Sequence, residues 1–262
     1  MQQRQPLLPR FVARLRRLRH ELFGREPSAQ EWEQRLERIV GDTVAESLRW
    51  IPEEGSFLDV GANVGVYAEG VLRARPRAKA WLFEPVRAHF ERCRKRFEGR
   101  PNVVVENLAL GDEPCEATIW KLKHNPGGNT LVHELAERWR QGHENADGKT
   151  ESPMHFRPEA VQCRVFDDYA REHGIERVDF IKSDTEGFDY RVLRGMLGFL
   201  ARCDPKPVIL AELWRADIFP DYEGQMSVLE SLYGLGYARV DLSRMNLAQD
   251  FLFVPMGREP IR

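Results

Sequence analysis

The stretch FLDVGANVG, residues 57–65, decides the fold class. An apolar run that reads as a β-strand enters a turn with two glycines, and a helical pattern begins at Val66. Ligands of open α/β sheets bind outside the carboxyl ends of the strands, where such turns lie. Glycine lets the backbone turn tightly and lets a ligand approach the main chain. The stretch therefore predicts a doubly wound α/β sheet with a ligand site at this turn.

The chain beyond Pro52 continues this pattern, because short β-rich runs alternate with helical stretches. Such alternation is typical of βαβ units and a mainly parallel sheet. The predicted strands are 56–60, 80–84, 103–106, 117–122, 161–165, 179–183, 208–212, 238–242 and 251–254, and the clearest helices are 66–75, 87–98 and 190–200. Strands 117–122 and 161–165 have no obvious helix before them, so we expect them to form an added pair outside the parallel set.

The N-terminal 50 residues read as a helical extension, and residues 51–262 read as the main domain. Residues 7–23 carry apolar residues at helical spacing with arginines between them, which predicts a basic amphipathic helix. It could bind a membrane surface or a partner, but we favour packing on the protein's own body or on a second subunit. Ser28 and Glu31 form a capping-box pattern that opens a second helix reaching about Trp50.

Residues 123–160 are polar and interrupted by glycines and prolines, and they contain four histidines, His124, His133, His143 and His155. A loop of this length inside a domain is usually functional or disordered. The irregular histidine spacing gives no metal-ligand pattern. We predict a lid or substrate loop.

Composition excludes several classes of protein. A net charge of -2 over 262 residues argues against a surface built for nucleic acid, and no apolar run approaches the roughly 20 residues that span a bilayer. The four cysteines, Cys93, Cys115, Cys163 and Cys203, form no C-x-x-C pair, and the N-terminus lacks a secretory signal. We expect a cytoplasmic protein.

Acidic residues at the strand ends indicate the ligand. The glycine turn lacks the third glycine of a dinucleotide fingerprint, and Asp59 would repel a pyrophosphate but attract an ammonium such as that of a methionine moiety. Glu84 ends the next strand about 20 residues later, the usual place of an acid that holds both ribose hydroxyls. Ribose occurs in both NAD and S-adenosylmethionine.

A second group of acids follows the strands 179–183 and 208–212. Asp184, Glu186 and Glu212 should meet at the carboxyl edge of the sheet, where a substrate must lie. Carboxylates gather at such places for proton transfer, for a divalent metal or for a cationic ligand group. Glu186 could instead cap the following helix.

The motifs LDVGANVG, LFEP, NLALGD, FIKSDTEG with VLRG after it, and ILAE, in this order, resemble the FkbM-type family of S-adenosylmethionine-dependent methyltransferases. The resemblance spans about residues 55–254 and implies a seven-stranded methyltransferase sheet and, most often, O-methylation. It also implies that the cofactor lies at the turn with Asp59, Gly61, Asn63 and Gly65, its ribose on Glu84, and its adenine near residues 107–112, which include Asn107, Ala109 and Asp112.

Methyl transfer to an alcohol needs a general base or a metal that lowers the pKa of the hydroxyl. We predict Asp184 as the central acid with Glu186 and Glu212 as partners, and Lys182, His124 or His133 as substrate contacts. Asp184 and Glu212 could hold Mg²⁺. The expected partner is a small acceptor with a hydroxyl group on a sugar or secondary metabolite, and the N-terminal helices could join copies of the chain. The alternatives are a nicotinamide-dependent oxidoreductase and a nucleoside-binding module without catalysis.

Overall fold

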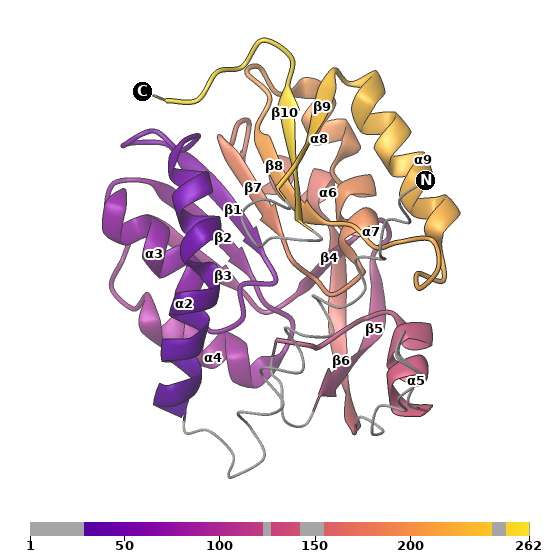
Figure 1. The fold of residues 1–262 in the computed structure, drawn as a ribbon. Helices are drawn as coiled ribbons and strands as arrows, with labels where there is room; N and C mark the ends of the chain where they lie inside the picture. Colours follow the sequence, from indigo (N-terminus) through magenta and orange to yellow (C-terminus); the bar gives the residue numbers. More distant parts are fainter. Residues whose placement is uncertain (1–28, 123–126, 142–154, 243–249, 262) are drawn as a thin grey trace, which may run out of the picture.

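The computed structural model describes residues 29–122, 127–141, 155–242 and 250–261. Its main sheet has seven strands in the order β3-β2-β1-β7-β8-β10-β9 (Figure 1). The strands are β1 (Ser56–Val60), β2 (Lys79–Phe83), β3 (Val103–Glu106), β7 (Phe180–Ser183), β8 (Val208–Glu212), β9 (Tyr237–Asp241) and β10 (Asp250–Pro255). The first five are parallel, and β10 runs antiparallel to both β8 and β9. The predicted mainly parallel seven-stranded sheet is confirmed.

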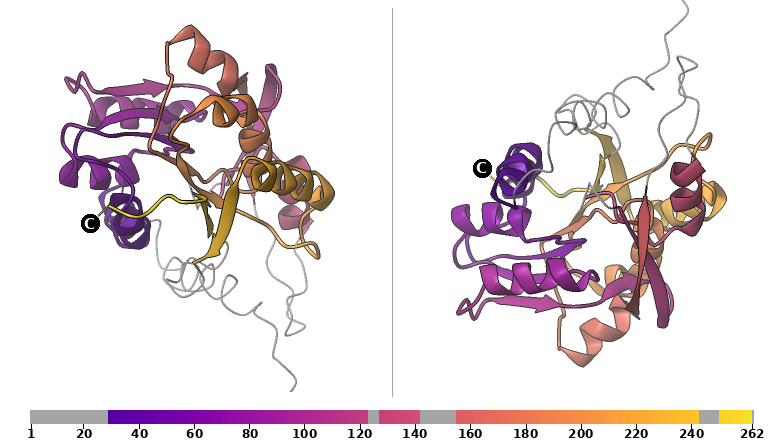
Figure 2. Two further views of the ribbon diagram at one scale, coloured as in Figure 1. Left: turned by 90° about the horizontal axis from the view of Figure 1, so that it is seen from above. Right: turned by 90° about the horizontal axis from the view of Figure 1, so that it is seen from below.

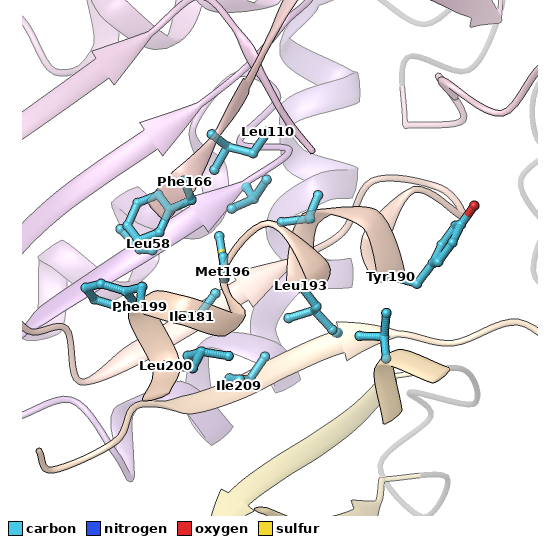
Figure 3. Close-up of a cluster of buried hydrophobic side chains, with 14 of the residues drawn as sticks. Leu58, Leu110, Phe166, Ile181, Tyr190, Leu193, Met196, Phe199, Leu200 and Ile209 are labelled. Carbon is cyan, nitrogen blue, oxygen red and sulfur yellow. The ribbon is translucent and has the colours of Figure 1, made fainter. Parts of the chain in front are cut away.

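Helices cover both faces of this sheet, as the views from above and from below show (Figure 2). One face carries α2 (Ala29–Leu48), α3 (Val66–Ala74) and α4 (Arg87–Arg96). The other carries α6 (Phe166–Glu172), α7 (Asp189–Arg194), α8 (Leu197–Arg202) and α9 (Tyr222–Gly234). Successive strand residues point to opposite faces of a sheet. Phe57 therefore packs in the core cluster on the α2–α4 face, and Leu58 packs in the core cluster on the other face. Figure 3 draws the second of these clusters, where Leu58 lies near side chains of α6, α7 and α8.

A second sheet of three strands lies outside the parallel set, as predicted for the pair 117–122 and 161–165. Its strands are β4 (Ala109–Gly111), β5 (Cys115–Leu122) and β6 (Phe156–Val165). Strand β6 lies between the others, antiparallel to β5 and parallel to β4. The short strand β4 was missed. Strand β6 also begins inside the segment predicted as one loop, and helix α5 (His133–Gln141) lies in that segment too.

The helix predicted over 190–200 is two helices, because α7 ends at Arg194 and α8 begins at Leu197. Gly195 between them lies against β4, since a Cβ there would be 2.0 Å from the carbonyl oxygen of Gly111. The helix predicted over 87–98 ends at Arg96. The basic helix predicted over 7–23 lies outside the described residues.

Helix α2, the described part of the predicted extension, packs on the main sheet's helical layer. Val40, Val44 and Leu48 contact the core cluster of α3, and a Cβ on Gly70 of α3 would lie 2.8 Å from Val44. A domain boundary at residue 50 stays a prediction. Among the described helices, none has both the length and the apolar character needed to cross a bilayer.

Candidate active site

The turn after β1 is held by contacts inside the protein. Gly61 has φ 79°, and a Cβ there would lie 2.1 Å from the carbonyl oxygen of Asp184. Gly65 has φ 82°, and a Cβ there would lie 2.6 Å from the ring of Phe97. We predicted that these glycines allow a tight turn and the approach of a ligand; the left-handed φ angles agree with the turn, and the close neighbours are the Asp184 carbonyl and the Phe97 ring. Glycine is therefore required by the left-handed backbone and by packing.

Glu84 joins this turn to the next one. It is 5% exposed, and its Oε2 accepts the Asn63 backbone N–H at 2.7 Å while Oε1 accepts the Val86 backbone N–H at 2.9 Å. Each carboxylate oxygen can accept a further hydrogen bond. Glu84 thus fixes both turns and still offers acceptors to a ligand.

A cavity of about 530 Å³, part of it open to solvent, lies at the carboxyl ends of β1, β2 and β7. One wall is apolar and comes largely from β4 and β5, whereas another is polar and comes from the turns after β1, β2 and β7. The lining residues are Val60, Gly61, Asn63, Phe83, Glu84, Pro85, His89, Leu108, Ala109, Leu110, Ile119, Gly127, Asn129, Leu131, Asp184, Thr185 and Glu186. The cavity thus brings together Gly61, Asn63, Glu84, Ala109, Asp184 and Glu186 from the predicted site.

Two of the residues expected near adenine do not line the cavity. The Asn107 side-chain amide donates to the backbone carbonyls of Glu84 and Pro85 at 3.0 and 2.9 Å. The Asp112 carboxylate pairs with Arg194 at 2.9 Å and with Arg191 at 3.7 Å. Asn107 therefore supports the turn after β2, and Asp112 joins β4's end to α7. Of the three expected residues, Ala109 alone lies in the cavity wall.

Asp59 and Lys182 form a buried ion pair beneath the turn. The Lys182 Nζ lies 3.2 Å from Asp59 Oδ1, 3.4 Å from Asp184 Oδ2 and 5.3 Å from the centre of the Tyr67 ring. We expected Asp59 to attract the ammonium of a ligand, but its carboxylate binds the ammonium of Lys182. Lys182, expected to contact substrate, is only 5% exposed. The packing of β1 against β7 thus pairs the two side chains inside the protein, and their contacts with cofactor and substrate stay predictions.

Burial and charge act in opposite directions in this pair. Burial raises the pKa of Asp59, and the neighbouring Lys182 only partly offsets that effect. Burial would lower the pKa of Lys182, but Asp59 and Asp184 together raise it above its usual value. We therefore place the positive charge on Lys182. Asp59 Oδ2 is buried and has no hydrogen-bond partner among the described residues.

The loop after β7 presents the predicted catalytic acids. The Asp184 side chain is 51% exposed at the cavity. Glu186 has φ 52°, a left-handed conformation that is uncommon for a residue with a Cβ, and its carbonyl accepts the Thr130 hydroxyl at 2.7 Å. The N-cap of α7 is Phe188 and no side chain caps it, so Glu186 is not the cap of this helix.

Glu212 is buried at the end of β8, where its Oε2 accepts the Trp214 indole N–H at 3.0 Å. Burial raises its pKa well above the usual value, and the charges of Glu186, Asp189 and Asp184 raise it further. The acids therefore interact electrostatically, as expected for one edge of a sheet. Within the described ranges no three His, Cys, Asp or Glu side chains are grouped as metal ligands. Mg²⁺ held by the two carboxylates Asp184 and Glu212 stays a prediction, since Mg²⁺ commonly takes only one or two carboxylates.

The histidines of the predicted lid do not line the cavity where they are described. His133 is exposed, with its ring 5.0 Å from that of Trp120, while His124 and His143 lie outside the described residues. The cavity instead contains His89, Asn129 and Thr185, which sequence reasoning missed. His89 had a signal in the sequence, because it lies in the first turn of the helix that follows Glu84, the acid predicted to bind ribose.

The geometry defines an α/β protein with a partly apolar cavity at the carboxyl edge of its sheet, next to a cluster of acids. Residues 59–231 match the family model of the methyltransferase FkbM domain, and the chain belongs to that family. The predicted resemblance is confirmed.

Curated relatives match roughly half of the chain. The chain is 24% identical over 163 residues to Methyltransferase sdnD of Sordaria araneosa, covering 56% of this chain and 62% of that protein. It is 28% identical over 139 residues to the 2-O-methyltransferase NoeI of Sinorhizobium fredii, and the match covers 53% of this chain and 56% of that protein. It is 30% identical over 174 residues to the antimetabolite synthetase AmbE of Pseudomonas aeruginosa, and the match covers 56% of this chain and 8% of that protein. The chain thus spans less than two thirds of the length of these relatives.

Among solved structures, the chain is similar to the methyltransferase FkbM from Methylobacillus flagellatus. The TM-score is 0.47 at 14% sequence identity, and the match covers 77% of this chain and 44% of that one.

Proposed function

We propose that this protein transfers a methyl group from S-adenosylmethionine to a hydroxyl oxygen of a small acceptor, a sugar or a secondary metabolite. The observation that carries the proposal is Glu84, which presents a buried carboxylate at an apolar-backed cavity beside the acids that follow β7. Membership of the FkbM methyltransferase family favours this function over a nicotinamide-dependent oxidoreductase. The similarity to a relative named a 2-O-methyltransferase supports oxygen as the acceptor atom.

The residues of the cavity fit the proposed cofactor. Leu108, Ala109 and Leu110 offer an apolar surface to adenine, and Glu84 keeps free acceptor capacity for ribose hydroxyls. Asp184 lies on the other side of the Gly61 turn and carries a half-exposed carboxylate for the positive end of the molecule. The cofactor supplies an electrophilic methyl carbon on a sulfonium.

Asp184 is the best placed proton acceptor among the acids. Its carboxylate reaches solvent and the cavity, and the ammonium of Lys182 lies 3.4 Å from its Oδ2. Glu212 is buried among other acids, which raises its pKa and favours the protonated form. We therefore assign Asp184 to deprotonate the acceptor hydroxyl, and Glu212 to donate a hydrogen bond or to shape the site.

The lid predicted from the sequence lies partly over the cofactor cavity in this proposal. The described residues Gly127, Asn129 and Leu131 line the same cavity as Glu84, and Leu135 of α5 packs in the core. We propose that the segment 127–131 covers the cofactor, and that the acceptor enters over Asp184.

Thermal melting with two added compounds tests this function. S-Adenosylhomocysteine at 100 times its Kd should stabilise the protein by about 2.7 kcal/mol, whereas NADH should leave the melting temperature unchanged. Transfer of a labelled methyl group from S-adenosylmethionine to a panel of sugars and phenolic or aliphatic alcohols then identifies the acceptor class. Stabilisation by NADH without stabilisation by S-adenosylhomocysteine would overturn the proposal.

A further inference from the structure

We infer that His89 is a second nucleoside-binding residue, which shares one ribose hydroxyl of the ligand with Glu84. The inference rests on the proposed function, since it assumes that the cavity takes S-adenosylmethionine. It adds a residue that recognises the ribose from α4, opposite the turn after β1.

His89 lies in the first turn of α4 and lines the cavity together with Glu84. Its side chain is 13% exposed, and its Nδ1 is buried without a hydrogen-bond partner among the described residues. A buried polar atom without a partner costs free energy, and most such atoms in native proteins are paired. His89 Nδ1 is therefore a buried polar atom that can form a hydrogen bond with a ligand.

The distance between His89 and Glu84 suits a bridging oxygen. Nδ1 lies 3.8 Å from Glu84 Oε1, which is too long for a direct hydrogen bond. One oxygen atom can lie at about 2.8 Å from two atoms so separated, because hydrogen bonds of that length close the triangle. A hydroxyl can do so with correct chemistry: it donates to the carboxylate and accepts from the imidazole N–H.

The neighbouring groups leave this role open. Oε1 accepts one hydrogen bond, from the Val86 backbone N–H, and so retains a second acceptor position. Glu159 also interacts electrostatically with His89. Its carboxylate already binds Lys121 Nζ at 2.6 Å and the Arg87 backbone N–H at 2.9 Å. Glu84 is therefore the acid that shares a ligand with His89.

Calorimetry with S-adenosylhomocysteine and its 2′-deoxy and 3′-deoxy ribose analogues tests the contact. His89→Phe keeps an aromatic ring but has no ring nitrogen, so it should bind S-adenosylhomocysteine about 3- to 20-fold more weakly, as expected for one lost hydrogen bond. His89→Asn retains a side-chain amide near the position of Nδ1 and should recover part of the affinity. For the analogue that lacks the contacted hydroxyl, the wild type and His89→Phe should bind alike.

The exposed His155, placed just before β6, gives a matched control, and His155→Phe should bind all three ligands as the wild type does. Two results would overturn the assignment: an unchanged affinity of His89→Phe, or an equal loss for all three ligands, which would mean a bridging water or simple ring packing. Melting of the unliganded variants separates a folding defect from a lost contact. If the wild type binds no S-adenosylhomocysteine, the proposed function fails and this assignment fails with it.

Discussion

At the scale of single residues, the site contains two kinds of buried acid. Asp59 is compensated by the ammonium of Lys182 at 3.2 Å, whereas Glu84 is compensated by two backbone N–H groups. A carboxylate that accepts backbone hydrogen bonds can still bind a ligand, but one paired with a buried lysine is engaged in the fold. We therefore expect Glu84 to bind the ligand and Asp59 to support the fold.

The ion pair predicts a large loss of stability when one partner is removed. Lys182→Met should lower the free energy of unfolding by about 3–5 kcal/mol, because it leaves the Asp59 carboxylate buried without its cation. Urea denaturation measures the change. The double variant Asp59→Asn/Lys182→Met leaves neither Asp59 nor Lys182 as a buried charge, and Asp184, which also loses its lysine, is half exposed to solvent. It should therefore regain much of the loss; a double variant as unstable as Lys182→Met would contradict this explanation.

Glu84 predicts a loss of binding instead. Glu84→Gln removes the charge and half of the acceptor capacity of this side chain, so its affinity for S-adenosylhomocysteine should fall by more than tenfold, given about 1.5–3 kcal/mol for a hydrogen bond to a charged group. Calorimetry measures the affinity. Glu91→Gln, a change of a partly exposed acid on the same helix as His89, is the control and should bind normally. Equal affinity of Glu84→Gln and the wild type would remove Glu84 from the ribose site.

At the scale of elements, the segment before α5 is tied to the loop after β7. Thr130 is fully buried, its hydroxyl donates to the Glu186 carbonyl at 2.7 Å, and the same hydroxyl accepts the Val132 backbone N–H at 3.0 Å. A Cβ on Gly187 would lie 2.8 Å from Leu135, so α5 packs directly on this loop. The segment before α5 and the loop that carries the acids are therefore packed together as one unit.

The Thr130 hydroxyl can be removed at almost constant shape. Thr130→Val leaves two partly buried backbone groups without this partner, so we expect a loss of about 1–3 kcal/mol in stability and faster hydrogen exchange at the Val132 amide. Thr130→Ser keeps the hydroxyl and should exchange as the wild type does. Exchange measured by NMR or mass spectrometry compares the two variants, and identical protection in both would mean that the hydroxyl does not hold the segment.

Element by element, the sequence predicted what depends on local pattern. The glycine turn, the apolar strands and the acids at their carboxyl ends could be predicted, because parallel strands end at one edge of a sheet. Strand β4 has only three residues and shows no periodicity. Strand β6 contains Pro158, which argues against a strand on sequence alone.

The rest of the site depends on contacts between distant segments. The buried pairing of Lys182 with Asp59 follows from the register of β1 beside β7, and the role of Thr130 follows from the packing of α5 on the Glu186 loop. Asp112 satisfies the expected motif but its carboxylate is taken by arginines of α7. Such competition for a side chain leaves no mark in the local sequence.

At the scale of the whole molecule, the buried acids link folding to pH. The pKa of Glu212 is raised above the usual 4.5 by burial and by neighbouring acids, and burial raises the pKa of Asp189 to about 6. A group whose pKa is higher in the folded state contributes stability that is complete below its unfolded pKa and is lost as pH rises through its folded pKa. Both groups should therefore make the protein less stable at pH 8 than at pH 5.

Glu212→Gln isolates the share of one acid in this pH dependence. The amide has the shape of the protonated acid and can still accept the Trp214 N–H, but it never ionises. We expect the variant to be more stable than the wild type at pH 8 and the advantage to shrink toward pH 5, as measured by melting temperature across that range. Glu212→Ala, which opens a void, should be less stable at every pH. An advantage of Glu212→Gln that stays constant from pH 5 to pH 8 would show that Glu212 does not titrate in this range, and that its hydrogen bond, not its charge, is what the fold depends on.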